Sequence, residues 1–147
     1  SEHYPYWRQE LHLTEMPYGA FGENFTTCGL LEDEDCIGDI FKAGETIVQV
    51  SQPRQPCWKI ERRWGIKDFV VRMKQTGRTG WYFRVLQEGY AAAGNIFALT
   101  ERPFPQYTVA IAYGIMRNRN IHTKEAQALA QCPALSPRWQ ENLRSVK

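Results

Sequence analysis

The segment that most restricts the fold of this 147-residue chain is Val50–Cys57, in which two prolines follow an apolar run. Proline fixes its own φ angle and pushes the preceding residue toward extended geometry, so Pro53 and Pro56 predict a stiff, non-helical stretch. The preceding residues, 45–50, alternate and are rich in β-branched side chains, which predicts a strand. The chain therefore holds the Cys57 thiol at the exit of a strand.

Two interpretations of Cys57 remain open from the local pattern. Arg54 places a permanent positive charge three residues before the sulfur. Nearby cationic charge favours the thiolate, which is both the nucleophile and the metal-binding form. A single cysteine near the end of a strand can equally be a small buried hydrophobe.

Length and composition favour one domain with a sizeable core and exclude several functional classes. Eighteen basic and sixteen acidic residues give a formal charge of +2, too balanced to indicate a nucleic-acid or membrane surface. The four cysteines are unevenly spaced and form no CxxC pair, which favours a reducing, cytoplasmic location over a disulfide or zinc framework. The sequence contains no phosphate loop, nucleophile elbow or GxGxxG motif.

Periodicity, caps and turn residues divide the chain into predicted elements. Helices are expected at residues 1–13 with Ser1 as N-cap, at 66–75 ending near Gly77, at 109–116 after Thr108, at 124–130 after Thr123, and from Ser136-Pro137 onward. Strands are expected at 45–50, 80–86 and 96–99, with 24–27 β-prone, a loop over 16–22 and an acidic turn over 30–35.

These elements predict a mostly β fold with α additions, either a β-barrel or a sandwich. Helical character begins past Pro105, so we expect a β core over residues 1–105 and a C-terminal helical extension over residues 106–147. The apolar faces of the extension would either cover the barrel or form a homodimer contact.

Four motifs occur in an order that resembles the MOSC domain family, and specifically its YiiM-type branch. They are FGENFTT at 21–27, IGD at 37–39 with Gly44, VSQPRQPCWK at 50–59 and TGRTGWYFRV at 76–85. LSPRW at 135–139 resembles the helical tail of that branch. The resemblance implies a MOSC β-barrel with an inserted helix, a pyranopterin molybdenum cofactor, and Cys57 as the protein ligand to the metal.

Residue chemistry adds candidate cofactor contacts to this resemblance. Arg54 and Arg84 present planar donor forks suited to phosphate or pterin acceptors, and amides and hydroxyls suit the polar edges of a pterin. The predicted cofactor-binding set is Phe21, Gly22, Glu23, Asn24, Thr26, Thr27, Gln52, Arg54 and Arg84.

Each of these assignments has a structural alternative. Phe21 is also typical of a core aromatic, and Asn24 of a turn residue that bonds its own backbone. Glu23 is either a binding residue or a local cap or pairing group. Thr26 and Thr27 would face opposite sides of a strand, so only one of them would face the cofactor.

The resemblance implies an oxidoreductase that reduces N-hydroxylated compounds, including base analogues such as 6-hydroxylaminopurine. The sequence shows no flavin, haem or iron–sulfur pattern, so the electrons are expected from a separate reductase such as a flavoprotein. Direct binding of a nucleic-acid polymer or a membrane is not expected. The alternative is a non-catalytic module that carries the cofactor, or sulfur as a persulfide on Cys57.

One departure from the family bears on the barrel. Family members carry additional upstream strands and a histidine-glycine-glycine-type loop, and no segment here matches them. We therefore expect an N-terminally incomplete barrel, from a truncated or cleaved product or with its open edge covered by a partner.

Overall fold

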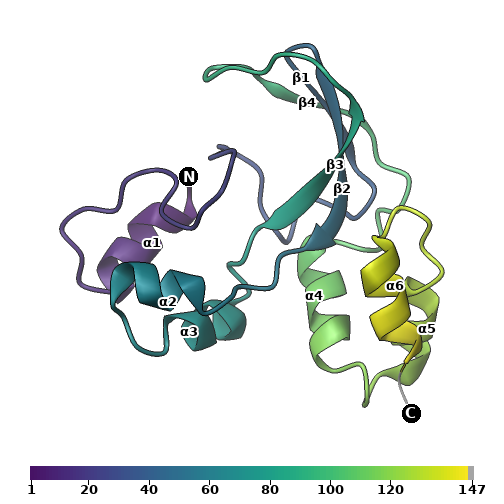
Figure 1. Ribbon diagram of the computed structural model, residues 1–147. Helices are drawn as coiled ribbons and strands as arrows, with labels where there is room; N and C mark the ends of the chain where they lie inside the picture. Colours follow the sequence, from purple (N-terminus) through teal and green to yellow (C-terminus); the bar gives the residue numbers. More distant parts are fainter. Residues whose placement is uncertain (146–147) are drawn as a thin grey trace. The chain divides into compact units, whose positions relative to one another are not determined.

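The computed structural model describes residues 1–145, which fall into two compact units (Figure 1). Unit 1 consists of Ser1–Leu31 and Gln55–Thr79. Unit 2 consists of Glu32–Arg54 and the chain from Gly80 onward. The chain therefore crosses between the units three times, and each unit combines segments that are distant in sequence.

Unit 1 is helical and forms around an aromatic cluster. Its helices are α1 (His3–Glu10), α2 (Lys59–Trp64) and α3 (Phe69–Thr76). Trp7 and Phe69 are both fully buried and meet edge to face, with ring centroids 5.1 Å apart. The Trp7 ring also meets the Tyr6 ring edge to face at 5.0 Å. The buried members of the cluster are Tyr4, Trp7, Met16, Ala20, Ile60, Phe69 and Met73.

The ends of these helices test the capping predictions. Gly77 has φ 71° and donates its N–H to the Met73 carbonyl, so the predicted glycine cap of α3 is confirmed. The predicted N-cap at Ser1 is wrong, because Glu2 occupies that position without a side-chain cap bond. Helix α2 was not predicted, since its six residues include the charged run Glu61–Arg63, which resembles a solvated surface segment.

Unit 2 contains one antiparallel sheet with strand order β3-β2-β1-β4. The strands are β1 (Ile40–Ala43), β2 (Thr46–Pro53), β3 (Trp81–Gln87) and β4 (Phe97–Glu101). Strands β1 and β2 pair from Ala43 opposite Thr46 to Ile40 opposite Gln49. The predictions at 45–50, 80–86 and 96–99 are confirmed, whereas the β-prone residues 24–27 form no strand.

The hairpin between β1 and β2 depends on a glycine. Gly44 has φ 61°, and a Cβ at this position would lie 2.5 Å from the Tyr90 carbonyl oxygen. The Glu45 N–H donates to the same carbonyl at 3.0 Å. The loop after β3 is therefore fastened to this turn at a distance that only glycine permits.

The sheet of the described residues is not closed into a barrel. Strands β3 and β4 lie at its two edges and pair only with β2 and β1 respectively. Closure needs the edge strands to pair with each other, directly or through further strands. The observed architecture is therefore mixed α/β, and the predicted mostly β barrel is not supported by these four strands.

Three helices complete unit 2: α4 (Val109–Arg117), α5 (Thr123–Leu129) and α6 (Pro137–Arg144), which Figure 1 shows packed side by side. The hydroxyls of Thr108 and Ser136 accept hydrogen bonds from backbone N–H groups at the starts of α4 and α6, so both predicted caps are confirmed. The N-cap of α5 is His122, so the prediction of Thr123 is wrong. The boundary predicted near residue 105 stays a prediction, since unit 2 holds both the sheet and these helices.

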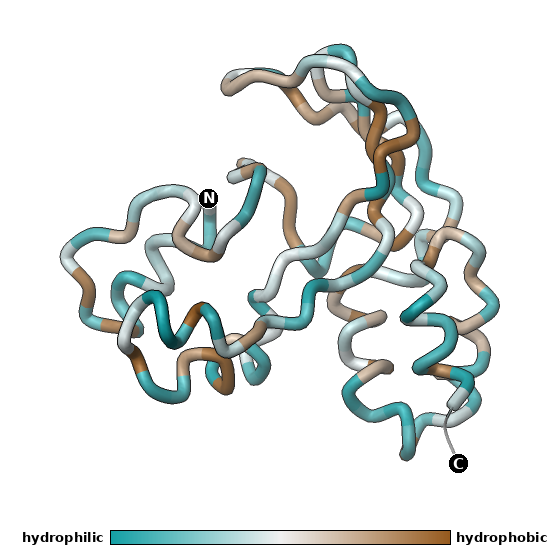
Figure 2. Tube along the Cα trace, viewed as in Figure 1, coloured by the Kyte–Doolittle hydropathy of each residue, from teal (hydrophilic) through white to brown (hydrophobic). Residues whose placement is uncertain are grey.

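Apolar residues gather along the strands of the sheet, as Figure 2 shows. Phe41, Ala43, Val48 and Val50 are buried, and they alternate with less buried neighbours along β1 and β2.

None of the helices within residues 1–145 combines the length and hydropathy needed to span a membrane.

A buried ion pair fixes the start of β1 to the chain that leaves β4. The Asp39 carboxylate is completely buried and accepts from Arg102 Nε at 3.0 and 3.1 Å and from its Nη2 at 2.6 Å. The Cys36 N–H donates to the same carboxylate at 2.9 Å. The bidentate geometry satisfies a charge that would otherwise be costly to bury.

We expect Asp39→Asn to lower the free energy of unfolding by about 3 kcal/mol, because it removes the buried, bidentate counter-charge of Arg102 and leaves only Asp35 at 3.8 Å. The measurement is urea denaturation followed by far-ultraviolet circular dichroism. The control is Glu10→Gln, which removes an exposed carboxylate 3.5 Å from Arg72 and should cost less than about 1 kcal/mol. Equal effects of the two substitutions would contradict a special role for the buried pair.

Candidate functional site

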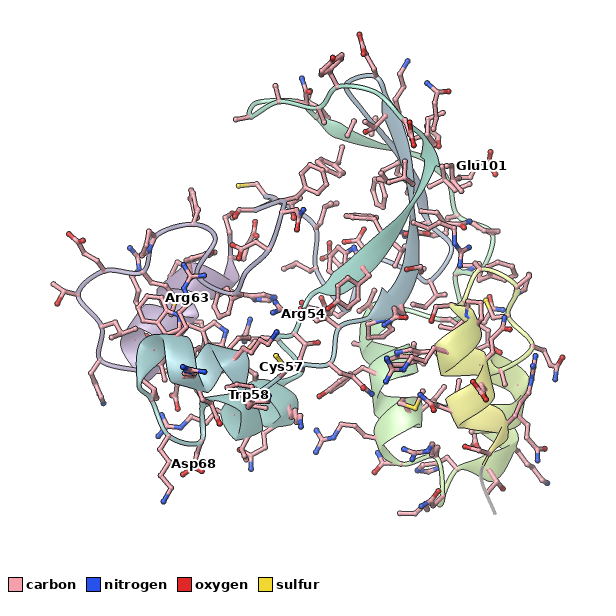
Figure 3. The ribbon with its side chains drawn as sticks, in the orientation of Figure 1. Arg54, Cys57, Trp58, Arg63, Asp68 and Glu101 are labelled. Atoms are coloured by element: carbon pink, nitrogen blue, oxygen red, sulfur yellow. The ribbon has the colours of Figure 1, made fainter. Side chains whose placement is uncertain are left out.

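Cys57 lies in the short link between β2 and α2 and has an exposed, free thiol. Pro56 before it is buried, and Figure 3 shows Cys57 and Trp58 directly before α2. The Cys57 carbonyl accepts a hydrogen bond from the Ile60 N–H at 3.2 Å, which begins the helical turn. The thiol is therefore displayed rather than buried, and the interpretation of Cys57 as a core hydrophobe is wrong.

The other cysteines have different surroundings. Cys36 and Cys132 are buried, as expected for packing residues. Burial, followed by the negative charge of Asp39, raises the pKa of the Cys36 thiol. Cys28 is exposed, contrary to a packing role, and its Sγ lies 2.8 Å from Ser1 Oγ. Among residues 1–145, Cys57 is thus the one exposed thiol without a hydrogen-bond partner.

The loop before Cys28 is organised by a single carboxylate. Glu23 Oε1 accepts from the Tyr4 hydroxyl, from the Gly19 N–H at 2.9 Å and from Thr26 Oγ1 at 2.9 Å. Glu23 Oε2 accepts from the Phe21 N–H at 3.1 Å. The carboxylate therefore joins helix α1 to three points of the loop.

This arrangement shifts two pKa values in opposite directions. Partial burial acts to raise the pKa of Glu23, but hydrogen bonds from Tyr4, Gly19 and Thr26 lower it below its ordinary value. Burial and the hydrogen bond to Glu23 raise the pKa of Tyr4 to about 12. Glu23 is therefore ionised and fully engaged, which confirms the local pairing interpretation and disfavours a general base at this position.

The neighbouring predicted residues have distinct surroundings within unit 1. Phe21 is half-buried and packs 5.3 Å from the Tyr4 ring and 6.2 Å from the Phe69 ring, which confirms its interpretation as a core aromatic. Asn24 is exposed, and its side chain has no hydrogen-bond partner within residues 1–145. The Thr26 hydroxyl is engaged by Glu23, and the backbone carbonyl of Thr27 accepts from the amino group of Ser1.

The backbone of this loop bears on the cofactor contacts predicted for Gly22, Thr26 and Thr27. Gly22 has φ 76° and is exposed, and a Cβ there would meet no atom within 4 Å. Because residues 24–27 form no strand, the expectation that Thr26 and Thr27 face opposite sides of a sheet no longer applies. The cofactor-binding roles of this loop stay predictions.

Gln52, Arg54 and Arg84 belong to unit 2. Gln52 Oε1 accepts from the Ser136 hydroxyl, which also caps α6. The Arg54 N–H donates to the Gly80 carbonyl at 2.9 Å, and Arg84 Nη1 donates to Gln49 Oε1 at 3.1 Å. These groups connect strands and helix within the unit, and their contacts with a cofactor likewise stay predictions.

Trp58 is a candidate that the sequence analysis did not select. Its side chain is 59% exposed, although tryptophan is normally well buried, and it directly follows Cys57. The Arg62 guanidinium carbon lies 6.0 Å from the centroid of its ring, one helical turn later. The signal available in the sequence was the position of Trp58 inside the motif that carries the thiol.

Comparison with known proteins supplies the family. Residues 1–97 match the MOSC domain. The chain belongs to the MOSC domain family. This match confirms, at the level of family, the resemblance inferred from the motifs at 21–27, 50–59 and 76–85. MOSC domains are associated with the molybdenum cofactor.

Relatives place this MOSC protein in the YiiM-type branch. Its fold superimposes on the crystal structure of YiiM from Geobacillus stearothermophilus with a TM-score of 0.94 at 40% identity, covering 97% of this chain and 73% of that one. It is 40% identical over 147 residues to the uncharacterized protein YflK of Bacillus subtilis (strain 168), covering 100% of this chain and 66% of YflK. A protein of Gibberella moniliformis (strain M3125 / FGSC 7600) named "Reductase" is 38% identical over 137 residues, which are 91% of this chain and 24% of that protein.

The MOSC chain thus spans slightly less than two thirds of YflK and about a quarter of the fungal reductase. Membership of the MOSC family therefore does not by itself assign the activity, substrates or partners of those longer proteins to this chain.

We expect Glu23→Gln to lower the free energy of unfolding by about 1–3 kcal/mol at pH 7, because a neutral amide accepts these hydrogen bonds less strongly than a carboxylate. The lowered pKa of Glu23 means that this advantage is present above the unfolded pKa of about 4.3 and is lost as the pH falls through the folded value. Urea denaturation of both proteins between pH 7 and pH 3 measures the difference.

The matched control is Glu15→Gln, which removes an exposed carboxylate of the same unit that has no partner within residues 1–145. Its effect should be small and should not change over this pH range. A Glu23→Gln deficit that persists unchanged at pH 3 would show that charge is not the source of the stabilisation.

Proposed function

We propose that this MOSC protein binds the pyranopterin molybdenum cofactor through the Cys57 thiolate and reduces N-hydroxylated compounds. The observation that carries the proposal is the exposure of Cys57 in a chain whose family is associated with that cofactor. The substrates in view include N-hydroxylated base analogues such as 6-hydroxylaminopurine.

The donor chemistry of unit 1 fits such a cofactor. No group of three or more histidine, cysteine or acidic side chains is arranged to hold a metal ion within residues 1–145. A pyranopterin brings its own dithiolene sulfurs to the metal, so one soft thiolate from the protein suffices. Cys57 can supply that ligand without rearrangement of a buried core.

The bound cofactor would supply two-electron redox chemistry at a sulfur-ligated metal. Reduction of an N-hydroxyl group consumes two electrons and two protons and yields the amine and water. The name of the fungal relative supports a reductive reaction. We assign the electron supply to a separate reductase, such as a flavoprotein.

The protein's own residues would hold and orient the reactants. The stiff Pro53–Pro56 segment sets the direction of the Cys57 thiol, which reduces the entropy lost when the ligand bond forms. The exposed indole of Trp58 offers a flat apolar surface next to the thiol in sequence. Planar heterocycles stack on such surfaces, which suits a base analogue better than an aliphatic hydroxylamine.

A second candidate is a non-catalytic module that carries the cofactor, or sulfur as a Cys57 persulfide. One observation favours it: the thiol is exposed, as a cofactor carrier or a sulfur carrier requires. A cofactor carrier differs from the proposed enzyme only in turnover, whereas a sulfur carrier also differs in the role of Cys57, which would hold a persulfide instead of a metal.

We expect Cys57→Ser to reduce the molybdenum content of the purified protein to background and to abolish reduction of 6-hydroxylaminopurine, because a hydroxyl is a poor replacement for the soft thiolate. Elemental analysis measures the metal, and reduced methyl viologen as electron source allows turnover to be measured without the partner. Cys28→Ser changes the other exposed thiol and should leave both quantities unchanged.

Metal bound without turnover in the unaltered protein would favour the carrier function. Full molybdenum content and turnover in the Cys57→Ser variant would overturn the assignment of the ligand.

We expect Trp58→Leu to raise KM for 6-hydroxylaminopurine about tenfold, since stacking on an aromatic side chain contributes about 1–3 kcal/mol per base. Reduction of hydroxylamine itself, which has no ring to stack, should keep its KM. Steady-state kinetics with the two substrates make the comparison. A parallel rise in both KM values would indicate a structural effect of Trp58 instead of substrate stacking.

A further inference from the structure

Arg78 in unit 1 has a fixed guanidinium. Its Cζ lies 4.4 Å from the centroid of the Tyr6 ring, within the range of a cation–π contact. Its Nη1 lies 3.2 Å from His3 Nδ1. Because a guanidinium can only donate, His3 Nδ1 must be the acceptor, which places the imidazole proton of neutral His3 on Nε2. The Tyr6 ring and the His3 imidazole together restrict the position of the Arg78 guanidinium.

The charge of Arg78 has no carboxylate partner within residues 1–145. In contrast, Arg102 is paired with Asp39, and Arg72 approaches Glu10. The Arg78 side chain is partly buried, where an uncompensated charge is more costly than on an open surface. Its immobilised positive charge is thus unmatched by the protein itself.

Most of the hydrogen-bonding capacity of Arg78 is also unused. A guanidinium has five N–H donors, and the bond to His3 uses one of them. The other four have no acceptor among the described residues. Gly77 precedes Arg78 with φ 71°, and a Cβ there would meet no atom within 4 Å. The Arg78 guanidinium therefore has unpaired donors, and the backbone at the neighbouring Gly77 is uncrowded.

We propose that Arg78 is the receptor of an oxyanion subsite for a phosphate group. A planar fork held in advance matches two oxygens of a phosphate, and the dianion supplies the missing counter-charge. The phosphate is either that of a bound cofactor or that of a free or substrate-borne group. The subsite does not depend on the proposed function, because phosphate binding can be measured even if Cys57 holds no metal.

The test is a titration of the purified chain with inorganic phosphate at constant ionic strength, with chloride as the balancing anion. Nuclear magnetic resonance detects the Arg78 Nε–H signal and the amide signals of Gly77 and Arg78. We expect saturable shifts in the unaltered protein. We expect binding about tenfold weaker in Arg78→Lys, which keeps the charge but loses the fork, and no saturable shifts in Arg78→Gln.

The matched control is Arg72→Gln, which removes the same charge from the same unit at a position that already faces a carboxylate. It should bind phosphate as the unaltered protein does. Amide spectra of each variant establish that it is folded, and Arg78→Lys keeps the test usable if Arg78→Gln does not fold.

Three outcomes would overturn the subsite: no saturable shifts in the unaltered protein, the same shifts with chloride alone, or equal affinity in the unaltered protein and folded Arg78→Lys. Repeating the titration on cofactor-loaded protein identifies the source of the phosphate. Weaker binding after loading would support occupation by the cofactor's own phosphate, and unchanged binding would support a free or substrate-borne phosphate. Failure of Cys57→Ser to lose metal would affect neither result.

Discussion

The sheet of unit 2 depends on the buried carboxylate of Asp39. Four donor contacts, three from Arg102 and one from the Cys36 N–H, converge on it directly before β1. The same residue accepts the Val50 N–H through its backbone carbonyl at 2.9 Å. One residue thus connects the start of β1, the middle of β2 and the chain beyond β4, and a missing partner would leave a charge in the interior.

Unit 1 depends on a second carboxylate, that of Glu23, which is part-buried and holds the loop between α1 and Cys28. Glu23 draws the Tyr4 hydroxyl, two backbone N–H groups and a threonine hydroxyl to one carboxylate. The aromatic cluster around Trp7 supplies the apolar contacts of this loop, since Phe21 packs against it. Hydrogen bonds therefore fix the shape of the loop while aromatic packing fixes its position on α1, and Tyr4 contributes to both through its hydroxyl and its ring.

The fold could be predicted from the sequence where signals were local. The β-branched alternation of β2, the hydroxyl caps Thr108 and Ser136 and the glycine after α3 each act within a few residues. Helix α2 and the pairing of β4 with β1 have no comparable local signature, since the first is only six residues long and the second joins residues about sixty positions apart. The barrel expectation failed for the same reason, because closure is a property of strand pairing and not of strand composition.

In the candidate site, too, features set by neighbouring residues could be predicted, whereas contacts between residues far apart in the sequence could not. The motif from Pro53 to Trp58 placed Cys57 at the exit of a strand, because proline geometry is encoded in the residues themselves, but whether the thiol is exposed or buried had to come from the structure. The engagement of Glu23 by Tyr4, and of Arg78 by Tyr6 and His3, could not be predicted, because it depends on helix α1 packing against loops 16 and more residues away. Cys57, Trp58 and Arg78 all lie on the connection between β2 and β3. A well-paired sheet can fix both ends of such a connection and leave its exposed side chains available for chemistry, which is the usual relation between a rigid scaffold and a functional loop.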